Sequence, residues 1–88
     1  MQFEFDPDKA AINHKKHGVH FSEAATCLLD EMALVHEDGD VAGEQRLVLV
    51  GMSAQARLLT VVYSLRGDTP RLISARKATT KEVKSYAQ

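Results

Sequence analysis

The chain has 88 residues, of which 44% are apolar and 26% charged, with one cysteine and no tryptophan. This length allows a single domain over residues 1–88, whose thin core would gain from a partner that covers apolar surface. One cysteine excludes a disulfide framework and a structural zinc site. No run approaches the ~20 apolar residues of a membrane span, and the first residues lack the basic start of a secretory signal. We therefore expect a cytoplasmic protein with no membrane association.

The formal net charge of −1 is an average over two unlike halves. Residues 1–44 contain ten acids and three bases, a net charge of −7, whereas residues 45–88 contain two acids and eight bases, a net charge of +6. Such asymmetry is typical of proteins with an anionic partner, although charges fall unevenly in many small proteins. Nucleic acid is therefore one candidate partner.

A first helix is predicted between a start signal and a stop signal. Asp6 is a strong N-cap, and Pro7 suits the first helical position because no N–H is needed there. Gly18 supplies the left-handed residue beyond a helix end, so we expect the helix to run to about His17. Residues 2–5 alternate in polarity and predict a short strand before it.

The next segment predicts a more apolar helix. Residues 21–29 carry apolar side chains at i, i+3, i+4, i+7 and i+8, a stripe that can pack on a sheet, and Ser22 suits the N-cap. Residues 33–36 favour a short edge strand. The acidic, glycine-containing residues 37–43 are typical of a loop.

The second half predicts three strands and a last helix. Strands are expected at residues 45–50, 57–66 and 71–78, with a turn at 67–70, and residues 79–82 match a capping box that starts a helix. The order β-α-α-(β)-β-β-β-α describes an α+β fold, an antiparallel sheet packed on two N-terminal helices. The middle strand is apolar on both faces, so the second face needs cover, which another chain can supply.

Arginines at strand positions or strand ends are the most informative polar residues. They are Arg46, Arg57, Arg66, Arg71 and Arg76. On one face they would form a rigid cationic patch suited to phosphate; the alternative is that they pair with the acidic half.

Strand register decides whether Arg66 and Arg76 share a face. Pairing Arg66 with Arg71 across a four-residue loop places Arg76 on the opposite face, whereas a shift by one residue brings Arg66 and Arg76 together. The shifted register separates polar from apolar residues better, because Ile73 then lies with the apolar side chains of the neighbouring strand. We therefore expect the shifted register.

Other polar residues allow acid–base chemistry. Lys9, Asn13 and His17 are spaced by four and form one polar ridge on the first helix, next to Lys16. The helix dipole favours protonated His17, which serves as phosphate ligand or general acid, or only as a C-terminal histidine packed on the sheet. Glu44 is either a general base or the salt-bridge partner of the arginine two residues later.

We expect no metal and no cofactor. His14, His17 and His20 are spaced by three, but Gly18 interrupts the helix between the last two, so they need not share a face. Cys27 lies near the edge of the apolar stripe, as structural cysteines do. The sequence contains no phosphate-binding glycine loop and no nucleophile elbow.

Several segments in combination resemble the BrnT family of bacterial toxins. The residues that carry the resemblance are Asp6, Lys9, Asn13, Lys16-His17-Gly18-Val19, Phe21, Ala24, Glu44, Arg46, Arg66, Ile73-Ser74-Ala75-Arg76, Ala78, Glu82 and Tyr86. They span nearly the whole chain, and the Lys-His-Gly-Val and Ile-Ser-Ala-Arg segments are specific in this order and spacing. Phe5 is a mild departure, since the family often has Trp there.

The resemblance implies a RelE-like fold and a toxin of a type II toxin–antitoxin system. Its activity would be that of a metal-independent endoribonuclease that cleaves RNA and inhibits translation. It also implies a BrnA-type antitoxin with a ribbon-helix-helix domain, in a heterotetramer that represses its own operon. Operator DNA would then be contacted through the antitoxin.

Cleavage without metal would use the RNA 2′-hydroxyl as nucleophile and yield a 2′,3′-cyclic phosphate. The expected catalytic residues are Arg66, Arg76, His17 and Glu44, and the expected substrate-binding residues are Arg46, Lys9, Lys16 and Tyr86. Here the two catalytic arginines stabilise the transition state, the histidine is the acid and the glutamate the base. The tyrosine orients substrate or only packs the last helix.

Two rival functions remain open from the sequence. A non-catalytic binding module would use the basic face to dock an acidic partner helix. An inactive toxin would be kept as a transcriptional co-repressor. Cleavage of RNA in EDTA and toxicity of the chain expressed alone distinguish both from the ribonuclease.

Overall fold

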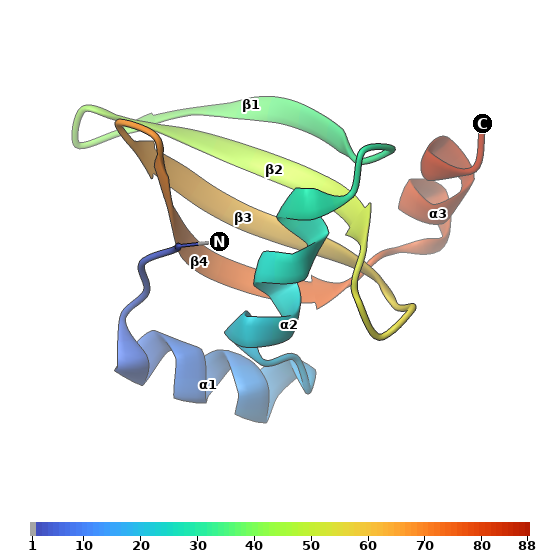
Figure 1. Cartoon of the computed structure of the whole chain (residues 1–88), viewed down its shortest axis with the longest axis horizontal. Helices are drawn as coiled ribbons and strands as arrows, with labels where there is room; N and C mark the ends of the chain where they lie inside the picture. Colours follow the sequence, from blue (N-terminus) through green and yellow to red (C-terminus); the bar gives the residue numbers. More distant parts are fainter. Residues whose placement is uncertain (1) are drawn as a thin grey trace.

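The computed structural model describes residues 2–88, which form helices and one four-stranded antiparallel sheet (Figure 1). The elements are α1 (Pro7–His17), α2 (Phe21–Thr26), the 3₁₀ helix η1 (Cys27–Leu29), β1 (Leu34–Val41), β2 (Glu44–Met52), β3 (Leu58–Arg66), β4 (Thr69–Lys77) and α3 (Thr80–Tyr86). The sheet order is β1-β2-β3-β4, so each strand pairs with its neighbour in the chain. The expected α+β fold is confirmed. None of the helices in residues 2–88 combines the length and apolar character needed to cross a membrane.

Helix α1 begins and ends at the expected residues. The Asp6 side chain accepts a hydrogen bond from the backbone N–H of Asp8 at 2.9 Å, and Gly18 caps the other end with a φ of 70°, a conformation that Gly adopts without steric cost. The segment before α1 forms less than the expected strand. It makes a single parallel bridge, between Glu4 and Arg71 of β4.

The expected helix over residues 21–29 is shorter than predicted. Its α-helical part ends at Thr26, and the last three residues form η1, a tighter turn common at helix ends. The N-cap is His20, not Ser22, which lies one residue inside the helix. Val19 and Phe21, the residues on either side of this N-cap, are both buried.

The expected loop over residues 37–43 is wrong. Strand β1 continues to Val41, which pairs with Glu44, and the hairpin turns through Ala42 and Gly43 alone. Both turn residues have positive φ, 53° and 80°, as type I′ hairpin turns require. The acidic residues are compatible with a strand here because β1 is an edge strand whose side chains are all exposed.

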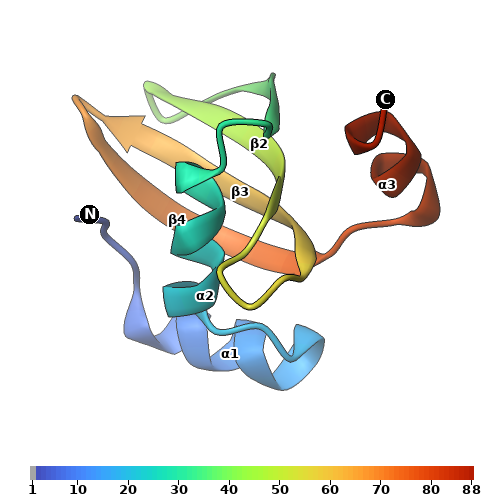
Figure 2. The same cartoon turned by 45° about the vertical axis from the view of Figure 1, so that its right-hand side comes forward.

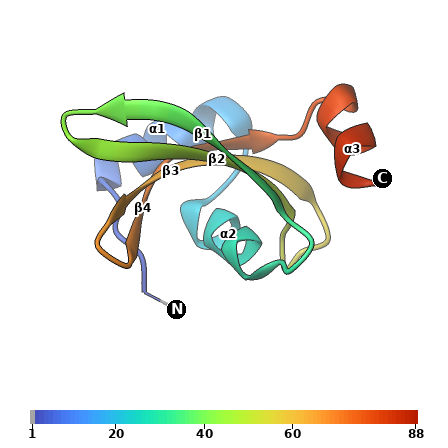
Figure 3. The same cartoon turned by 90° about the horizontal axis from the view of Figure 1, so that it is seen from above.

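Both N-terminal helices pack against the sheet, but in different places. Helix α2 covers one face, whereas α1 runs beside β4, and α3 lies beyond the other end of the sheet (Figures 1, 2 and 3). The buried core between α2 and the sheet consists of Val19, Phe21, Ala24, Ala25, Cys27, Leu47, Leu49, Leu59, Val61, Tyr63, Leu72 and Ala75. We call the other face of the sheet, which α2 does not cover, the open face.

One buried amide joins α1 to β4. Asn13 donates hydrogen bonds to the carbonyls of Val19 at 3.1 Å and Ala75 at 2.9 Å, and its Oδ1 accepts from the Ala75 N–H at 3.0 Å. Asn13 is therefore not part of an exposed polar ridge with Lys9 and His17, as the spacing predicted. It holds the helix that carries them.

A β-bulge sets the register of the last hairpin, and both registers considered from the sequence are wrong. Arg66 pairs with Thr69 across a two-residue turn, and the register then shifts between Val62 and Tyr63, where β4 has an extra residue, Ile73. Because of this extra residue, β4 turns the same face to the core before and after the bulge, although the core residues on its two sides are an odd number of positions apart. The open face receives Arg71, Ser74 and Arg76, opposite Ser64, Val62 and Thr60 respectively. The expectation that Arg66 and Arg76 share a face holds, whereas Ile73 does not join the apolar face.

Candidate functional site

A polar row crosses the open face near the β3–β4 hairpin. Arg46 of β2 pairs with Ser64 of β3, which pairs with Arg71 of β4. Directly paired residues of neighbouring strands place their side chains on the same face, a few ångströms apart. The sheet thus brings two arginines from distant parts of the sequence to either side of a serine.

This row forms the floor of a hollow of about 230 Å³, which we call the inner hollow. It is lined by Lys9, Val41, Ala42, Glu44, Arg46, Ser64, Arg71 and Ile73. Three of these side chains are cationic and one is anionic. The lysine belongs to α1, so the helix beside β4 supplies one wall of a hollow whose floor is the sheet.

Glu44 is the acid of the inner hollow and is held by two neighbours. Its carboxylate accepts a hydrogen bond from the Ser64 hydroxyl at 3.1 Å and lies 3.5 Å from Nε of Arg66. The sequence offered Arg46 as its salt-bridge partner, but the ion pair in the structure is with Arg66. A half-buried carboxylate beside a hydroxyl and a cation can accept a proton from a substrate hydroxyl.

Arg46 is a partly buried cation of the hollow. Its Nε is a buried atom with no hydrogen-bond partner among residues 2–88. A buried donor without an acceptor is unfavourable, because it loses its bond to water and gains none. Arg46 also lines the inner hollow, where its guanidinium can donate to an anionic ligand with several oxygens, such as a phosphate.

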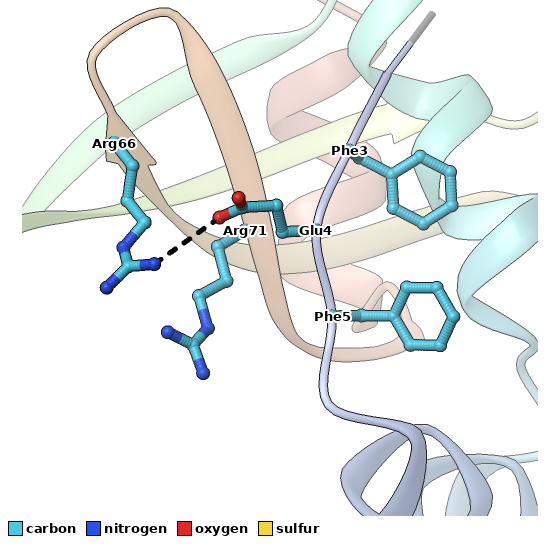
Figure 4. Close-up of a pocket in the computed structure, with 5 residues that line it drawn as sticks. All are labelled: Phe3, Glu4, Phe5, Arg66 and Arg71. Atoms are coloured by element: carbon cyan, nitrogen blue, oxygen red, sulfur yellow. Dashed lines mark ion pairs between the residues drawn. The ribbon is translucent and has the colours of Figure 1, made fainter.

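Two further hollows adjoin the inner one. The first, of about 200 Å³, is lined by Lys9, Ile12, Asn13, Lys16, His17, Ile73 and Ser74, and we call it the helix hollow. The second, of about 420 Å³, is lined by Phe3, Glu4, Phe5, Arg66 and Arg71, and we call it the outer hollow (Figure 4). Lys9 and Ile73 line both the helix and inner hollows, whereas Arg71 lines both the inner and outer ones. The three hollows therefore follow one another along β4.

Arg76 lies on the same face but away from these hollows. Thr60, its strand partner, is six residues from Arg66 along β3, which at the usual rise corresponds to about 20 Å. The Arg76 guanidinium donates to Glu82 of α3 at 2.8 Å, and Glu82 also accepts from the Thr60 hydroxyl at 2.9 Å. The hydrogen bond from Arg76 is the main cause that lowers the pKa of Glu82 to about 2.

Tyr86 is also remote from the hollows that contain Arg46 and Arg66. Its hydroxyl donates to Asp30 at 2.6 Å, and this bond raises the pKa of the tyrosine. Asp30 also accepts from the backbone N–H of Met52 and Met32. Of the two roles predicted for Tyr86, these contacts support the packing of α3.

Arg57, another strand arginine, is a structural residue. Its guanidinium forms a salt bridge with Glu23 of α2, whose side chain is only 8% exposed, and it also donates to the Gly18 carbonyl at 3.3 Å. The hydrogen bond from Arg57 lowers the pKa of Glu23, and the Ser53 hydroxyl adds to this effect. This pair of a buried carboxylate and a partly exposed guanidinium joins α2 and the end of α1 to the start of β3.

Residues 2–88 contain no group of three or more His, Cys, Asp or Glu side chains placed to hold a metal ion. His14 and His20 stack with ring centroids 3.7 Å apart, whereas His17 lines the helix hollow. Cys27 is fully buried, and burial raises the pKa of its thiol to about 12. The thiol is therefore protonated at neutral pH.

The candidate site thus differs in part from the one that the sequence predicted. The structure brings together Glu44, Arg46, Arg66 and Lys9, and places His17 and Lys16 in the adjoining helix hollow. The sequence assigned no role to Ser64 or Arg71. A signal was present, because Ser64 is a polar residue within an apolar strand, but only the cross-strand register shows that Arg71 joins it.

Comparison with known proteins identifies the family. The family model described as the ribonuclease toxin BrnT of type II toxin–antitoxin systems matches residues 5–82. The crystal structure of the Brucella abortus ribonuclease toxin BrnT is similar to this chain, with a TM-score of 0.68 and 25% identity, and the match covers 91% of this chain and 99% of that one. No curated protein sequence matches the chain. The chain therefore belongs to the BrnT family of ribonuclease toxins of type II toxin–antitoxin systems.

Proposed function

We propose that the chain cleaves RNA without a metal ion at the inner hollow, and that this cleavage inhibits translation. The observation that carries the proposal is the inner hollow, in which Lys9, Arg46 and Arg71 lie around the same space as the Glu44 carboxylate. The three cations can bind a phosphate, and the carboxylate is a base within the same hollow. Family membership supports ribonuclease activity in general; the reaction chemistry is our inference.

In the proposed reaction the RNA itself supplies the nucleophile. Glu44 accepts the proton of a 2′-hydroxyl, the freed oxygen forms a bond to the adjacent phosphorus, and the bond from phosphorus to the 5′-oxygen breaks. The products are a 2′,3′-cyclic phosphate and a 5′-hydroxyl end. The leaving oxygen takes a proton from an acid in the adjoining helix hollow, for which His17 is our candidate.

Cations around the phosphate favour the transition state, where negative charge on its oxygens increases. We assign this role to Arg46, Arg66 and Arg71, because they line the inner hollow or contact its base. Lys9 and Lys16 then bind the RNA backbone along α1. Arg76 is paired with Glu82, so the Arg76→Ala variant tests its role. Loss of cleavage in a folded Arg76→Ala protein would mean that Arg76 also stabilises the transition state.

The test is cleavage of a single-stranded RNA by the purified chain in EDTA, with mass spectrometry of the new ends. Glu44→Gln and Arg46→Ala should each lower the rate by about 10²-fold or more. Lys84→Ala removes an exposed charge of α3 and serves as the matched control. Unchanged rates in folded Glu44→Gln and Arg46→Ala, or products without a 2′,3′-cyclic phosphate, would contradict this mechanism.

The acid is identified separately. His17→Ala should slow the cleavage of an RNA with an ordinary 5′-oxygen leaving group. It should have a much smaller effect on the cleavage of an RNA whose leaving group needs no proton, such as a 5′-bridging thiolate. Lys9→Ala is the comparison, because Lys9 lines both hollows. If only Lys9→Ala shows this selective loss, the acid is Lys9 and not His17.

We further propose that a BrnA-type antitoxin neutralises the chain in a heterotetramer, which acts in the cytoplasm and binds operator DNA through the antitoxin. Membership of a type II toxin–antitoxin family implies an antitoxin partner and an RNA target. Co-expression with the neighbouring reading frame should abolish growth arrest and yield a complex that shifts operator DNA. Operator binding without toxicity of the chain alone would favour the inactive co-repressor.

A further inference from the structure

The N-terminal segment places an acid against the cations of the outer hollow. Glu4 is held on the edge of β4 by two backbone hydrogen bonds, from its N–H to the Pro70 carbonyl and from the Leu72 N–H to its own carbonyl, both 2.9 Å long. Figure 4 shows its side chain directed to Arg66 and Arg71, whereas the rings of the flanking phenylalanines point the other way. Successive side chains of an extended segment point to opposite sides, so the Glu4 side chain lies on the side of the two arginines.

The flanking aromatic rings fix this orientation. Phe5 packs edge-on against Phe21 of α2 with ring centroids 6.2 Å apart, and Phe3 lies 5.7 Å from Phe5. A slip by one residue would remove both rings from α2 and turn Glu4 away from the arginines. The position of the carboxylate is thus set by the core side of the same segment.

The pairing of Glu4 with the cations is loose. Its carboxylate lies 3.8 Å from Nη1 of Arg66, and both side chains are about half exposed. Arg71, which lines the same hollow, forms none of the ion pairs found among residues 2–88. Exposed ion pairs of this kind contribute little stability, so a phosphate with several oxygens can replace the carboxylate.

We infer that the outer hollow is a second phosphate-binding subsite, in which Arg66 and Arg71, besides their role at the scissile phosphate, bind the RNA phosphate next to it. Glu4 occupies the place of that second phosphate in the free protein. This inference rests on the proposed function, because the scissile phosphate is placed in the inner hollow. Arg71 lines both hollows and Arg66 contacts Glu44, so the two subsites are continuous. The substrate is then a single strand that extends past the cleaved bond, and Glu4 selects against shorter anions.

The experiment compares binding of two fully 2′-O-methylated, uncleavable RNAs, a dinucleotide with one phosphodiester and a tetranucleotide with three. Glu4→Gln should tighten tetranucleotide binding about two- to fivefold, the range of one exposed ion pair, and leave dinucleotide binding unchanged. Glu4→Lys should also steepen the dependence of log Kd on log salt by about 0.7 for the tetranucleotide, as one more phosphate contact does. Glu31→Gln, the same change at an exposed residue outside the three hollows, is the matched control.

Three outcomes would overturn the inference: no effect of Glu4→Gln on the tetranucleotide, equal tightening of both RNAs, or the same tightening in Glu31→Gln. The last two would mean that Glu4 acts only through the net charge. Thermal unfolding of each variant confirms that the segment still folds on β4. Cleavage of unmodified RNA is read separately, so failure of the proposed reaction and failure of this subsite remain distinguishable.

Discussion

Replacement of Asn13 by alanine should loosen the helix that carries Lys9 and His17. Three hydrogen bonds of the amide would be lost, two to backbone groups of Ala75 and one to Val19. At about 1 kcal/mol for each buried bond, the variant should lose about 3 kcal/mol of unfolding free energy. This is a large part of the total of about 4–13 kcal/mol typical of this length.

Urea unfolding followed by circular dichroism measures this loss, and thermal unfolding should show a decrease of about 12–24 °C in Tm. Lys15→Ala, an exposed substitution on the same helix, should change the free energy by less than about 0.5 kcal/mol. A loss below about 1 kcal/mol for Asn13→Ala, or an equal loss for Lys15→Ala, would refute the role given to the amide.

Three further predictions concern buried or paired groups. The pKa of Glu82 is about 2 against an ordinary 4.5, so its contribution to stability is complete above pH 4.5 and is lost as the pH falls toward 2; Glu82→Gln should flatten that part of the stability profile in urea titrations. Arg57→Ala should lower the unfolding free energy, because the buried Glu23 carboxylate then keeps only its hydrogen bond from Ser53, and a double variant with Glu23→Gln should regain part of this loss in the same assay. Cys27, whose pKa is raised to about 12, should react with a thiol-specific dye at pH 8 only after denaturation; rapid labelling of the folded chain would contradict its burial.

Local signals predicted the elements best. Helix α1 and the capping box of α3 follow from a few adjacent residues, and the structure confirms both. The extent of β1 could not be predicted in this way, because its acidic residues are tolerated only at a sheet edge, which is a tertiary property. The bulge was equally hidden, since strand alternation alone does not reveal where one extra residue is accommodated.

The kinds of residue in the candidate site could be predicted from the sequence, but which particular residues come together could be predicted only in part. Glu44, Arg46 and Arg66 were identified from the sequence and do meet in space. Arg76 was expected with them, but it is paired with α3, a contact that depends on where the chain turns after β4. Arg71 was noted among the strand arginines without a role, because its position beside Ser64 depends on the register.

The extra residue of β4 also determines where this strand tolerates shortening. Leu72 and Ala75 both face the core, with Ser74 on the open face between them and Ile73 additional to the ladder. In a chain that lacked Ile73, the side chains of this strand would therefore alternate regularly, and all the remaining ones would keep their present faces. Removal of Ser74 would have the same effect on the phase, with Ile73 in its place, whereas removal of an interior residue elsewhere in β4 would exchange core and surface over part of the strand. In insertion–deletion terms, Ile73 and Ser74 mark the place in β4 where the loss of one residue preserves the phase of the strand.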